Sequence, residues 1–222
     1  MFLYFILLSV IYSGEFEEVN IDDISSTRIL SMAQDSTGFI WIGTDDGLNR
    51  YDGFKNKIYR SNIFDETTIS GNRIWKIHVD SSNTVWVLTD RGVCYYNVLL
   101  NQFERIETKS RPQHLHDEKN TIFVSTLNHG IYAINKETKA FKNHLFDPLD
   151  PFSISSSKFS VLQAKPTAAD GDGLWVGTLN GLNKLSLKTG QAKRLYSKKT
   201  NYVKSDTITA ILFVDSVLYV GT

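Results

Sequence analysis

Residues 41–51 read WIGTDDGLNRY, and this stretch decides the fold because it returns along the chain. It recurs at 86–96 as WVLTDRGVCYY and at 175–185 as WVGTLNGLNKL. A weaker copy starts at Phe123 and reaches its glycine one residue late, at Gly130, and a fifth copy starts near Tyr219. The five aromatic positions are 45, 37, 52 and 44 residues apart. Self-similarity at a period of about 20 to 50 residues is typical of solenoids and propellers.

A second element repeats upstream of these aromatic residues. Asp35, Asp80 and Asp117 each lie six residues before their aromatic residue. Earlier in the unit, an Ile-Ser pair leads to a basic residue and an apolar one, as ISSTRI at 24–29, ISGNRI at 69–74 and ISSSKF at 154–159. Two elements in register over several copies indicate one repeating structural unit.

Each unit is expected to form four short antiparallel strands. In the first unit, 29–34, 39–44, 48–52 and 55–60 are compatible with strands and are separated by Asp- and Gly-rich turns. Gly47 is expected to take a positive φ in the tight turn before 48–52. Four antiparallel strands in about 44 residues correspond to one blade of a propeller. We therefore predict an all-β fold, a β-propeller with four-stranded antiparallel blades.

The number of repeats is smaller than a closed ring needs. With 1–14 set aside, residues 15–222 hold about four to five units of this length. We therefore expect an incomplete propeller, part of a larger protein, that would associate with the remaining blades of that protein or with another copy of itself. Unclosed rings expose strand edges and apolar blade faces, which favours such association.

The repeated residues have a structural explanation. A blade is a twisted sheet that packs between two neighbours, so large aromatic side chains are expected to fill the interfaces and glycines to permit close approach. The predicted structural residues are Trp41, Gly43, Gly47, Trp86, Gly92, Phe123, Gly130, Trp175, Gly177, Gly181 and Tyr219.

Composition excludes several classes of protein. The 222 residues are 41% hydrophobic and 12% aromatic, enough to form a core, and 24 basic residues balance 24 acidic ones. Because nucleic-acid binding depends on a surplus of Lys and Arg, we expect no nucleic-acid partner. The single cysteine, Cys94, excludes an internal disulfide and any site built from several cysteines.

The first residues differ from the rest. Residues 2–12 are apolar or aromatic except for Ser9, and small residues follow at Ser13 and Gly14. Eleven residues are too few to span a bilayer of about 30 Å as a helix. We interpret residues 1–14 as a signal peptide or the end of a membrane segment, and either interpretation places the remaining chain outside the cytoplasm.

The chain resembles the two-component regulator propeller repeat. The resemblance rests on the Ile-Ser element, the aspartate before a Gly-containing turn, the W-x-G-T-x-x-G-L pattern and the Tyr51-Asp52 pair. Residues 38–53, GFIWIGTDDGLNRYDG, are similar to a first repeat of this kind, and the resemblance covers about residues 16 to 222. Such repeats build the periplasmic sensor region of hybrid two-component histidine kinases in gut Bacteroidetes.

The resemblance implies a sensor of glycan breakdown products. It implies a periplasmic location, association with the inner membrane in the full-length parent, and no enzymatic activity in this segment, since the kinase lies in parts that this sequence does not contain. The family commonly has two seven-bladed propellers, an immunoglobulin-like domain, a membrane helix and the signalling domains. This sequence departs from that pattern because it has fewer repeats and none of the other parts.

One set of charged residues suggests a ligand. If the strand that starts near Ile29 is the innermost of its blade, then Arg28, Arg73 and Lys158 stand at equivalent positions beside a central channel. The turns that hold Asp46, Arg91, His129 and Asn180 are expected to open onto the same face. Converging cations would favour an anionic ligand such as an acidic oligosaccharide. Solvated side chains without a ligand are the simpler interpretation of the same pattern.

No other pattern indicates catalysis, a metal or a cofactor. His114 and His116 alternate on a strand, but no third ligand is identifiable. Residues 170–173 read DGDG and lack the further acidic ligands of a calcium loop. Two alternatives to a sensor remain open. One is a propeller enzyme of the lyase or glycosidase type with His, Glu or Asp at the channel mouth, and the other is a truncated remnant without function.

Overall fold

The protein is described here by a computed structural model that covers residues 21–164, 173–195, 206–214 and 217–222. These residues form strands, turns and loops without any helix, so the described part of the chain holds no helix able to cross a membrane. The predicted segment 1–14 and the 170–172 part of the DGDG stretch lie outside the described residues.

Four sheets of four antiparallel strands follow one another along the chain, and each sheet has its strands in sequence order. The strands are, sheet by sheet, β1 Ile29–Gln34, β2 Ile40–Thr44, β3 Leu48–Tyr51 and β4 Asn56–Tyr59; β5 Ile74–Val79, β6 Val85–Thr89, β7 Val93–Asn97 and β8 Gln102–Ile106; β9 Pro112–Glu118, β10 Thr121–Thr126, β11 Ile131–Asn135 and β12 Phe141–His144; β13 Phe159–Ala164, β14 Gly173–Thr178, β15 Gly181–Ser186 and β16 Ala192–Leu195. A further hairpin joins β17 Ala210–Val214 to β18 Val217–Gly221.

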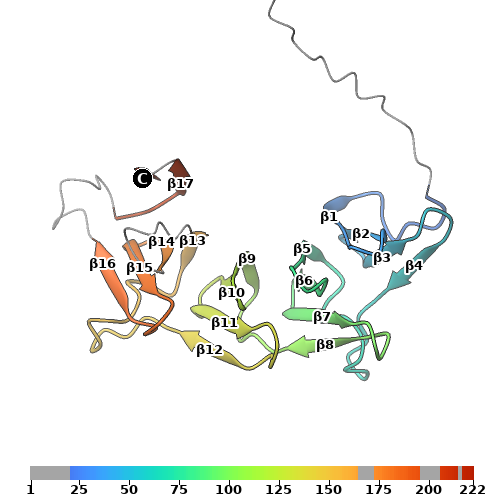
Figure 1. Ribbon diagram of the computed structural model, residues 1–222, viewed down its shortest axis with the longest axis horizontal. Coiled ribbons are helices and arrows are strands. Elements are labelled where there is room, and N and C mark those ends of the chain that lie inside the picture. The colour runs from blue at the N-terminus through green and yellow to red at the C-terminus, as the bar shows by residue number, and fades with distance from the viewer. Residues whose placement is uncertain (1–20, 165–172, 196–205, 215–216) are drawn as a thin grey trace, which may run out of the picture.

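The sheets are arranged as propeller blades. Figure 1 shows them side by side along an arc, with the first strand of each sheet (β1, β5, β9 and β13) on the concave side and the last (β4, β8, β12 and β16) on the convex side. The predicted fold, an all-β propeller with four-stranded antiparallel blades, is therefore confirmed. The strands predicted in the first repeat agree with β1 to β4 to within two residues at each end.

The aspartate six residues before the tryptophan closes the first hairpin of the blade. In the first blade, Asp35 Oδ1 accepts hydrogen bonds from the backbone N–H groups of Thr37 (2.9 Å) and Phe39 (3.1 Å). Its Oδ2 accepts a bond from Trp41 Nε1 at 2.8 Å. Burial alone would raise the pKa of Asp35, but these bonds lower it below its usual value. The carboxylate thus fixes both the turn and the position of the indole.

The second blade repeats this arrangement and the third changes it. Trp86 Nε1 donates to Asp80 Oδ2 at 2.8 Å. In the third blade Asp117 belongs to strand β9 itself, because the β9–β10 connection is a two-residue turn. The aromatic residue there is Phe123, which has no N–H to donate. The Asp117 carboxylate therefore binds other partners, described below.

Each aromatic side chain packs on the next blade. Trp41 lies in one cluster with Ile74, Val87 and Phe103 of the second blade. Trp86 packs with residues of the third blade, Phe123 with residues of the fourth, and Trp175 with Ile208 and Ile211 beyond the fourth. Tyr219 differs, since it is 57% exposed on β18, which among the described strands pairs only with β17.

Gly43 and Gly47 serve two different purposes. A Cβ at Gly43 would lie 2.5 Å from Cγ2 of Ile74, so this glycine lets β2 approach the inner strand of the second blade. Gly47 has a φ of 137° and donates its N–H to the carbonyl of Asn72 at 2.8 Å. The other glycines of the repeat, Gly92, Gly130, Gly177 and Gly181, are buried.

We expect Gly43→Val to destabilise the chain by about 1–3 kcal/mol, because overpacking forces neighbouring side chains and backbone to shift. Gly53→Val is the control, since a Cβ there meets no atom within 4 Å, although its φ of 96° adds some backbone strain. Urea denaturation followed by circular dichroism measures both changes. Equal losses of stability at the two positions would contradict close packing at Gly43.

The Ile-Ser element fastens the inner strand to its own blade in the first, second and fourth blades. Ser155 donates its N–H to Asn183 Oδ1 at 2.8 Å, and its hydroxyl is 2.9 Å from Thr178 Oγ1. Ser25 binds Asn49 and Thr44 in the same way. In the second blade Cys94 replaces the asparagine, and burial raises the pKa of its thiol to about 11. Cys94 is therefore a buried packing residue.

An arginine on the outermost strand organises the segment between some blades. Arg105 on β8 donates to the carbonyls of Thr68 (2.8 Å), Asn62 and Asp65 (both 2.9 Å). Arg194 on β16 donates to the carbonyls of Ser153 (2.7 Å) and Asp150 (2.7 Å) in the corresponding segment of the fourth blade. The two arginines hold these loops against the convex side.

Candidate functional site

The first strand of each blade starts beside a basic residue at one end of the propeller. Arg28 precedes β1, Arg73 precedes β5 and Lys158 precedes β13. In each case the first residue of the strand pairs with the threonine that ends the second strand, as in Ile74 opposite Thr89. The structure thus brings these three predicted residues to equivalent places on the inner strands of the first, second and fourth blades.

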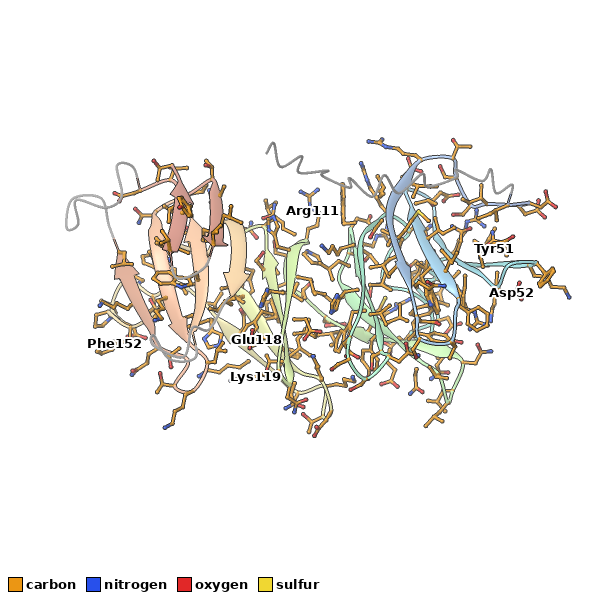
Figure 2. All side chains as sticks on the ribbon, turned by 45° about the horizontal axis from the view of Figure 1, so that its top comes forward. Tyr51, Asp52, Arg111, Glu118, Lys119 and Phe152 are labelled. Carbon is orange, nitrogen blue, oxygen red and sulfur yellow. The ribbon has the colours of Figure 1, made fainter. Side chains whose placement is uncertain are left out.

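A fourth basic residue occupies the same place in the third blade and escaped the sequence analysis. Arg111 precedes β9, and its carbonyl accepts a bond from the N–H of Leu127 at 2.9 Å. In the same manner, the N–H of Asp90 donates to the carbonyl of Arg73 (3.0 Å) and the N–H of Leu179 donates to the carbonyl of Lys158 (3.3 Å). Figure 2 shows Arg111 at one end of β9 and Glu118 and Lys119 at the other.

The turns between the second and third strands lie at this end too. They contain the four predicted residues Asp46, Arg91, His129 and Asn180. Asp46 Oδ2 is 3.0 Å from Arg60 Nη2, so its carboxylate is directed along the outer part of the blade. Asn180 Nδ2 donates to the carbonyl of Ser155 at 3.3 Å, whereas Arg91 is exposed. His129 is half-buried, and its carbonyl accepts a bond from Asn143 Nδ2 at 3.1 Å.

The positive charge is least compensated in the third and fourth blades. Arg28 Nη1 lies 4.0 Å from Asp45 Oδ2, and Asp90 Oδ1 accepts a bond from the N–H of Arg73 at 3.3 Å. The corresponding turn residues of the next two blades are Leu127 and Leu179, which are apolar. Arg111 and Lys158 form no ion pair with the described residues. An anion would therefore meet uncompensated charge here.

Each inner strand carries one extra residue next to its basic residue. The register with the second strand shifts between Ile29 and Ser31 in β1, between Ile74 and Lys76 in β5 and between Phe159 and Val161 in β13. In β9 the shift falls between Pro112 and His114. The unpaired residues are Leu30, Trp75, Gln113 and Ser160. β-Bulges occur often at the rims of β structures and beside functional sites, where they redirect a side chain.

A second group of ionisable side chains lies between the second and third blades. His78 Nε2 is 2.8 Å from Asp117 Oδ2, and Lys136 Nζ forms an ion pair with Asp117 Oδ1. Burial alone would raise the pKa of Asp117, but the bonds from Lys136 and His78 lower it below its usual value. His116 Nε2 is 3.6 Å from Glu118 Oε2. In the described part of the chain no three such groups are placed to bind a metal ion.

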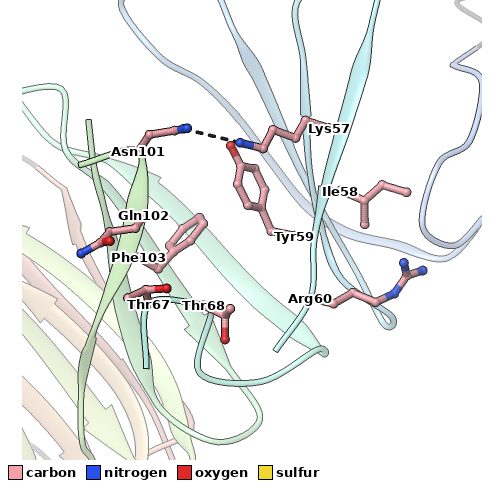
Figure 3. A pocket seen from close by; sticks show the side chains of 9 residues that line it. All are labelled: Lys57, Ile58, Tyr59, Arg60, Thr67, Thr68, Asn101, Gln102 and Phe103. Carbon is pink, nitrogen blue, oxygen red and sulfur yellow. Dashed lines mark hydrogen bonds between the residues drawn. The ribbon is translucent and has the colours of Figure 1, made fainter. Parts of the chain in front are cut away.

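A pocket of about 310 Å³ lies on the convex side between the first two blades (Figure 3). Tyr59 and Phe103 line it, with ring centroids 5.1 Å apart, and Lys57 Nζ reaches Asn101 Oδ1 at 3.5 Å across it. Burial raises the pKa of the Tyr59 phenol, so the group stays protonated. This pocket lies on the outer strands and contains none of the predicted ligand-binding residues.

These features define a propeller with a cationic end built from its inner strands. Residues 23–46, which contain Arg28, Asp45 and Asp46, match the family described as two component regulator propeller. This stretch therefore matches a repeat of this family, and the resemblance read from the sequence is confirmed over these residues.

Several known proteins are similar to parts of this chain. "Histidine kinase P4" of Formosa agariphila is 48% identical over 50 residues, which are 22% of this chain and 4% of that protein. The extracellular domain of a putative hybrid two component system from B. thetaiotaomicron superposes with a TM-score of 0.62 at 22% identity, over 85% of this chain and 26% of that one. PorZ, a surface component of the type-IX secretion system of Porphyromonas gingivalis, superposes with a TM-score of 0.60 at 14% identity, over 95% of this chain and 33% of that one. The chain thus spans a small part of each of these proteins.

Proposed function

We propose that the chain is an extracytoplasmic ligand-binding part of a two-component sensor and has no catalytic role of its own. The proposed ligand is an anionic oligosaccharide derived from a glycan, bound at the cationic end. The sensor-type role rests on the family match, and the choice of a saccharide rests on the resemblance to glycan sensors.

The observation that carries the anionic part of this proposal is the row of basic residues Arg28, Arg73, Arg111 and Lys158. They stand at one structural position in four successive blades, immediately before the inner strand. Arg111 and Lys158 have no ion-pair partner among the described residues, so their charge is available to a ligand. Charge-assisted hydrogen bonds to carboxylate or sulfate groups are stronger than neutral ones.

Titration calorimetry with a panel of acidic and neutral oligosaccharides tests this function. We expect an acidic member to bind and its neutral counterpart not to bind. Lys158→Gln should weaken binding by about 10-fold or more, because hydrogen bonds to charged groups contribute about 1.5–3 kcal/mol. Affinity should also fall as salt rises, since exposed charges are screened.

Lys193→Gln is the matched control, because Lys193 is exposed on the outermost strand β16 and outside the cationic end. Its affinity should equal that of the unchanged chain. Binding that is the same for acidic and neutral sugars, or insensitive to Lys158→Gln and to its counterparts at Arg28, Arg73 and Arg111, would contradict the proposal. Conversion of the sugar to a product would indicate an enzyme instead.

A further inference from the structure

Trp75 stands apart from the other tryptophans of the repeat. It is the extra residue in the bulge of β5, whereas the corresponding residues of β1, β9 and β13 are Leu30, Gln113 and Ser160. Trp41 and Trp86 are 1% and 0% exposed within the blade interfaces, but Trp75 is only half-buried and belongs to none of the hydrophobic clusters. Its indole is therefore not required for packing between blades.

Two guanidinium groups from different blades lie over this indole. Arg73 Cζ is 4.2 Å and Arg111 Cζ 5.1 Å from the ring centroid. Both distances are within the roughly 6 Å over which a cation is attracted to an aromatic face. The attraction holds two like charges near one another at the junction of the second and third blades. Lys76, next in β5, adds a third cation to this region.

Buried polar atoms without partners gather at this place. Within the described residues, Arg73 Nε, Trp75 Nε1 and Gln113 Oε1 have no hydrogen-bond partner. The first two are donors only, because neither a guanidinium nor an indole N–H can accept a hydrogen bond. Trp41 and Trp86 satisfy their indole N–H groups on Asp35 and Asp80. Trp75 has no carboxylate in that position.

A pocket of about 260 Å³ opens beside these groups, lined by Trp75, Arg111, Pro112, Gln113 and His114. Burial, together with the nearby Lys76, lowers the pKa of His114, so its imidazole is neutral at pH 7. Pro112 and the neutral imidazole give the wall a partly apolar character. Arg111 is exposed, so its guanidinium is free to turn from the ring toward a ligand in the pocket.

We propose that this pocket binds the oxyanion group of an acidic sugar, with Arg111 and the Trp75 indole N–H as its donors and with the charge of Arg73, which lies over the same indole, close by. This inference rests on the proposed function and places the ligand's charged group at the junction of the second and third blades. Donors without acceptors, two cations over one ring and an adjoining pocket together favour an acceptor that carries negative charge. The group is a carboxylate or a sulfate, since both offer oxygens that a guanidinium can bind in bidentate fashion.

The test is a titration of the whole chain with glucuronate, glucose 6-sulfate and glucose, followed by calorimetry and by tryptophan fluorescence. We expect one or both anions to bind and to change the emission, and glucose to do neither; the better of the two identifies the oxyanion. Trp75→Phe keeps an aromatic ring and removes the N–H, and should weaken binding about 10-fold. Arg111→Gln should weaken it about 10- to 100-fold, with Lys193→Gln unchanged.

Two outcomes overturn this inference in distinguishable ways. If Trp75→Phe and Arg111→Gln bind as the unchanged chain does while Arg28→Gln and Lys158→Gln bind weakly, the cationic end binds anions elsewhere, and only the assignment of this pocket is wrong. If neither the two anions nor the acidic oligosaccharides bind, the proposed function fails with it. Each variant's circular dichroism spectrum and thermal midpoint, compared with those of the unchanged chain, identify any loss that comes from unfolding.

Discussion

Replacing Trp86 with alanine is expected to destabilise the chain by about 3–5 kcal/mol, the usual cost of removing a buried tryptophan from a core. The side chain is fully buried between the second and third blades and packs with Ile122 and Val124 of the third. Its ring centroid is 5.4 Å from that of Tyr95, and Lys139 Nζ lies 4.6 Å from its ring. Alanine would leave a cavity and an Asp80 oxygen without its donor.

Trp86→Phe separates these two contributions. Phenylalanine fills most of the volume, as Phe123 does at the corresponding position of the third blade, but it cannot donate to Asp80. We expect it to cost about 1.5–3 kcal/mol, the range for a hydrogen bond to a charged group. Trp75→Ala is the control for the loss of an indole, because Trp75 is half-buried and belongs to none of the hydrophobic clusters between blades, and its cost should be much smaller.

Chemical denaturation followed by circular dichroism gives these free energies of unfolding. If Trp86→Ala loses no more stability than Trp75→Ala, the interface between the second and third blades does not depend on the aromatic residue of the repeat. The same result would remove the physical explanation for the spacing of the tryptophans along the sequence.

The fold could be predicted from the sequence because its determinants are local and repeated. A spacing of six residues between aspartate and tryptophan places the two side chains on one hairpin, and the same hairpin recurs in the second blade. The residues expected to fill the interfaces, such as Trp41 and Trp86, are those that the structure buries. Each of these tryptophans packs with residues of its own unit or the next one, so the repeat pattern is enough to predict where it lies in the fold.

Arg111 was missed because the third unit lacks the Ile-Ser element by which its counterparts were aligned. Arg28 and Arg73 lie thirteen residues before their tryptophans, whereas Arg111 lies twelve before Phe123 and is followed by a proline. Counting back from Phe123 could have found it. The sequence does not mark Trp75 as the extra residue of a bulge. A bulge is defined by the register of two paired strands, and no regular spacing in the sequence indicates it.

The ion pairs of Asp117 could not be predicted either. Its partners, His78 and Lys136, come from the preceding blade and from a turn of its own blade, so their proximity appears only in the folded chain. The sequence does contain one indirect sign. The Phe123 side chain has no N–H to donate, so a partly buried carboxylate six residues earlier needs a different donor.

Replacing Lys136 with methionine is expected to cost up to about 3 kcal/mol at pH 7, because it removes a hydrogen bond to a charged group and leaves the partly buried Asp117 carboxylate with His78 as its remaining partner. The side chain of Lys136 is 5% exposed, and that of Asp117 is 21% exposed. Methionine keeps much of the buried chain length, so the loss reports the charge more than the packing. Lys193→Met, on the exposed outer strand, should change stability by less than about 0.5 kcal/mol.

The pH dependence of this loss identifies Asp117 as the group responsible. A carboxyl whose pKa is lowered on folding adds stability above its ordinary value of 3.8, and that stability disappears as the pH falls through the lower folded value. Without Lys136 the pKa of Asp117 rises, so Asp117 is protonated more readily in the variant. The difference in unfolding free energy between Lys136→Met and the unchanged chain should therefore shrink as the pH is lowered from 7 toward 3.

A difference that stays constant over this range would mean that Lys136 stabilises the fold by packing alone. In that case Asp117→Asn/Lys136→Met would cost as much as the two single changes added together, whereas an ion pair predicts that the double change costs less than their sum.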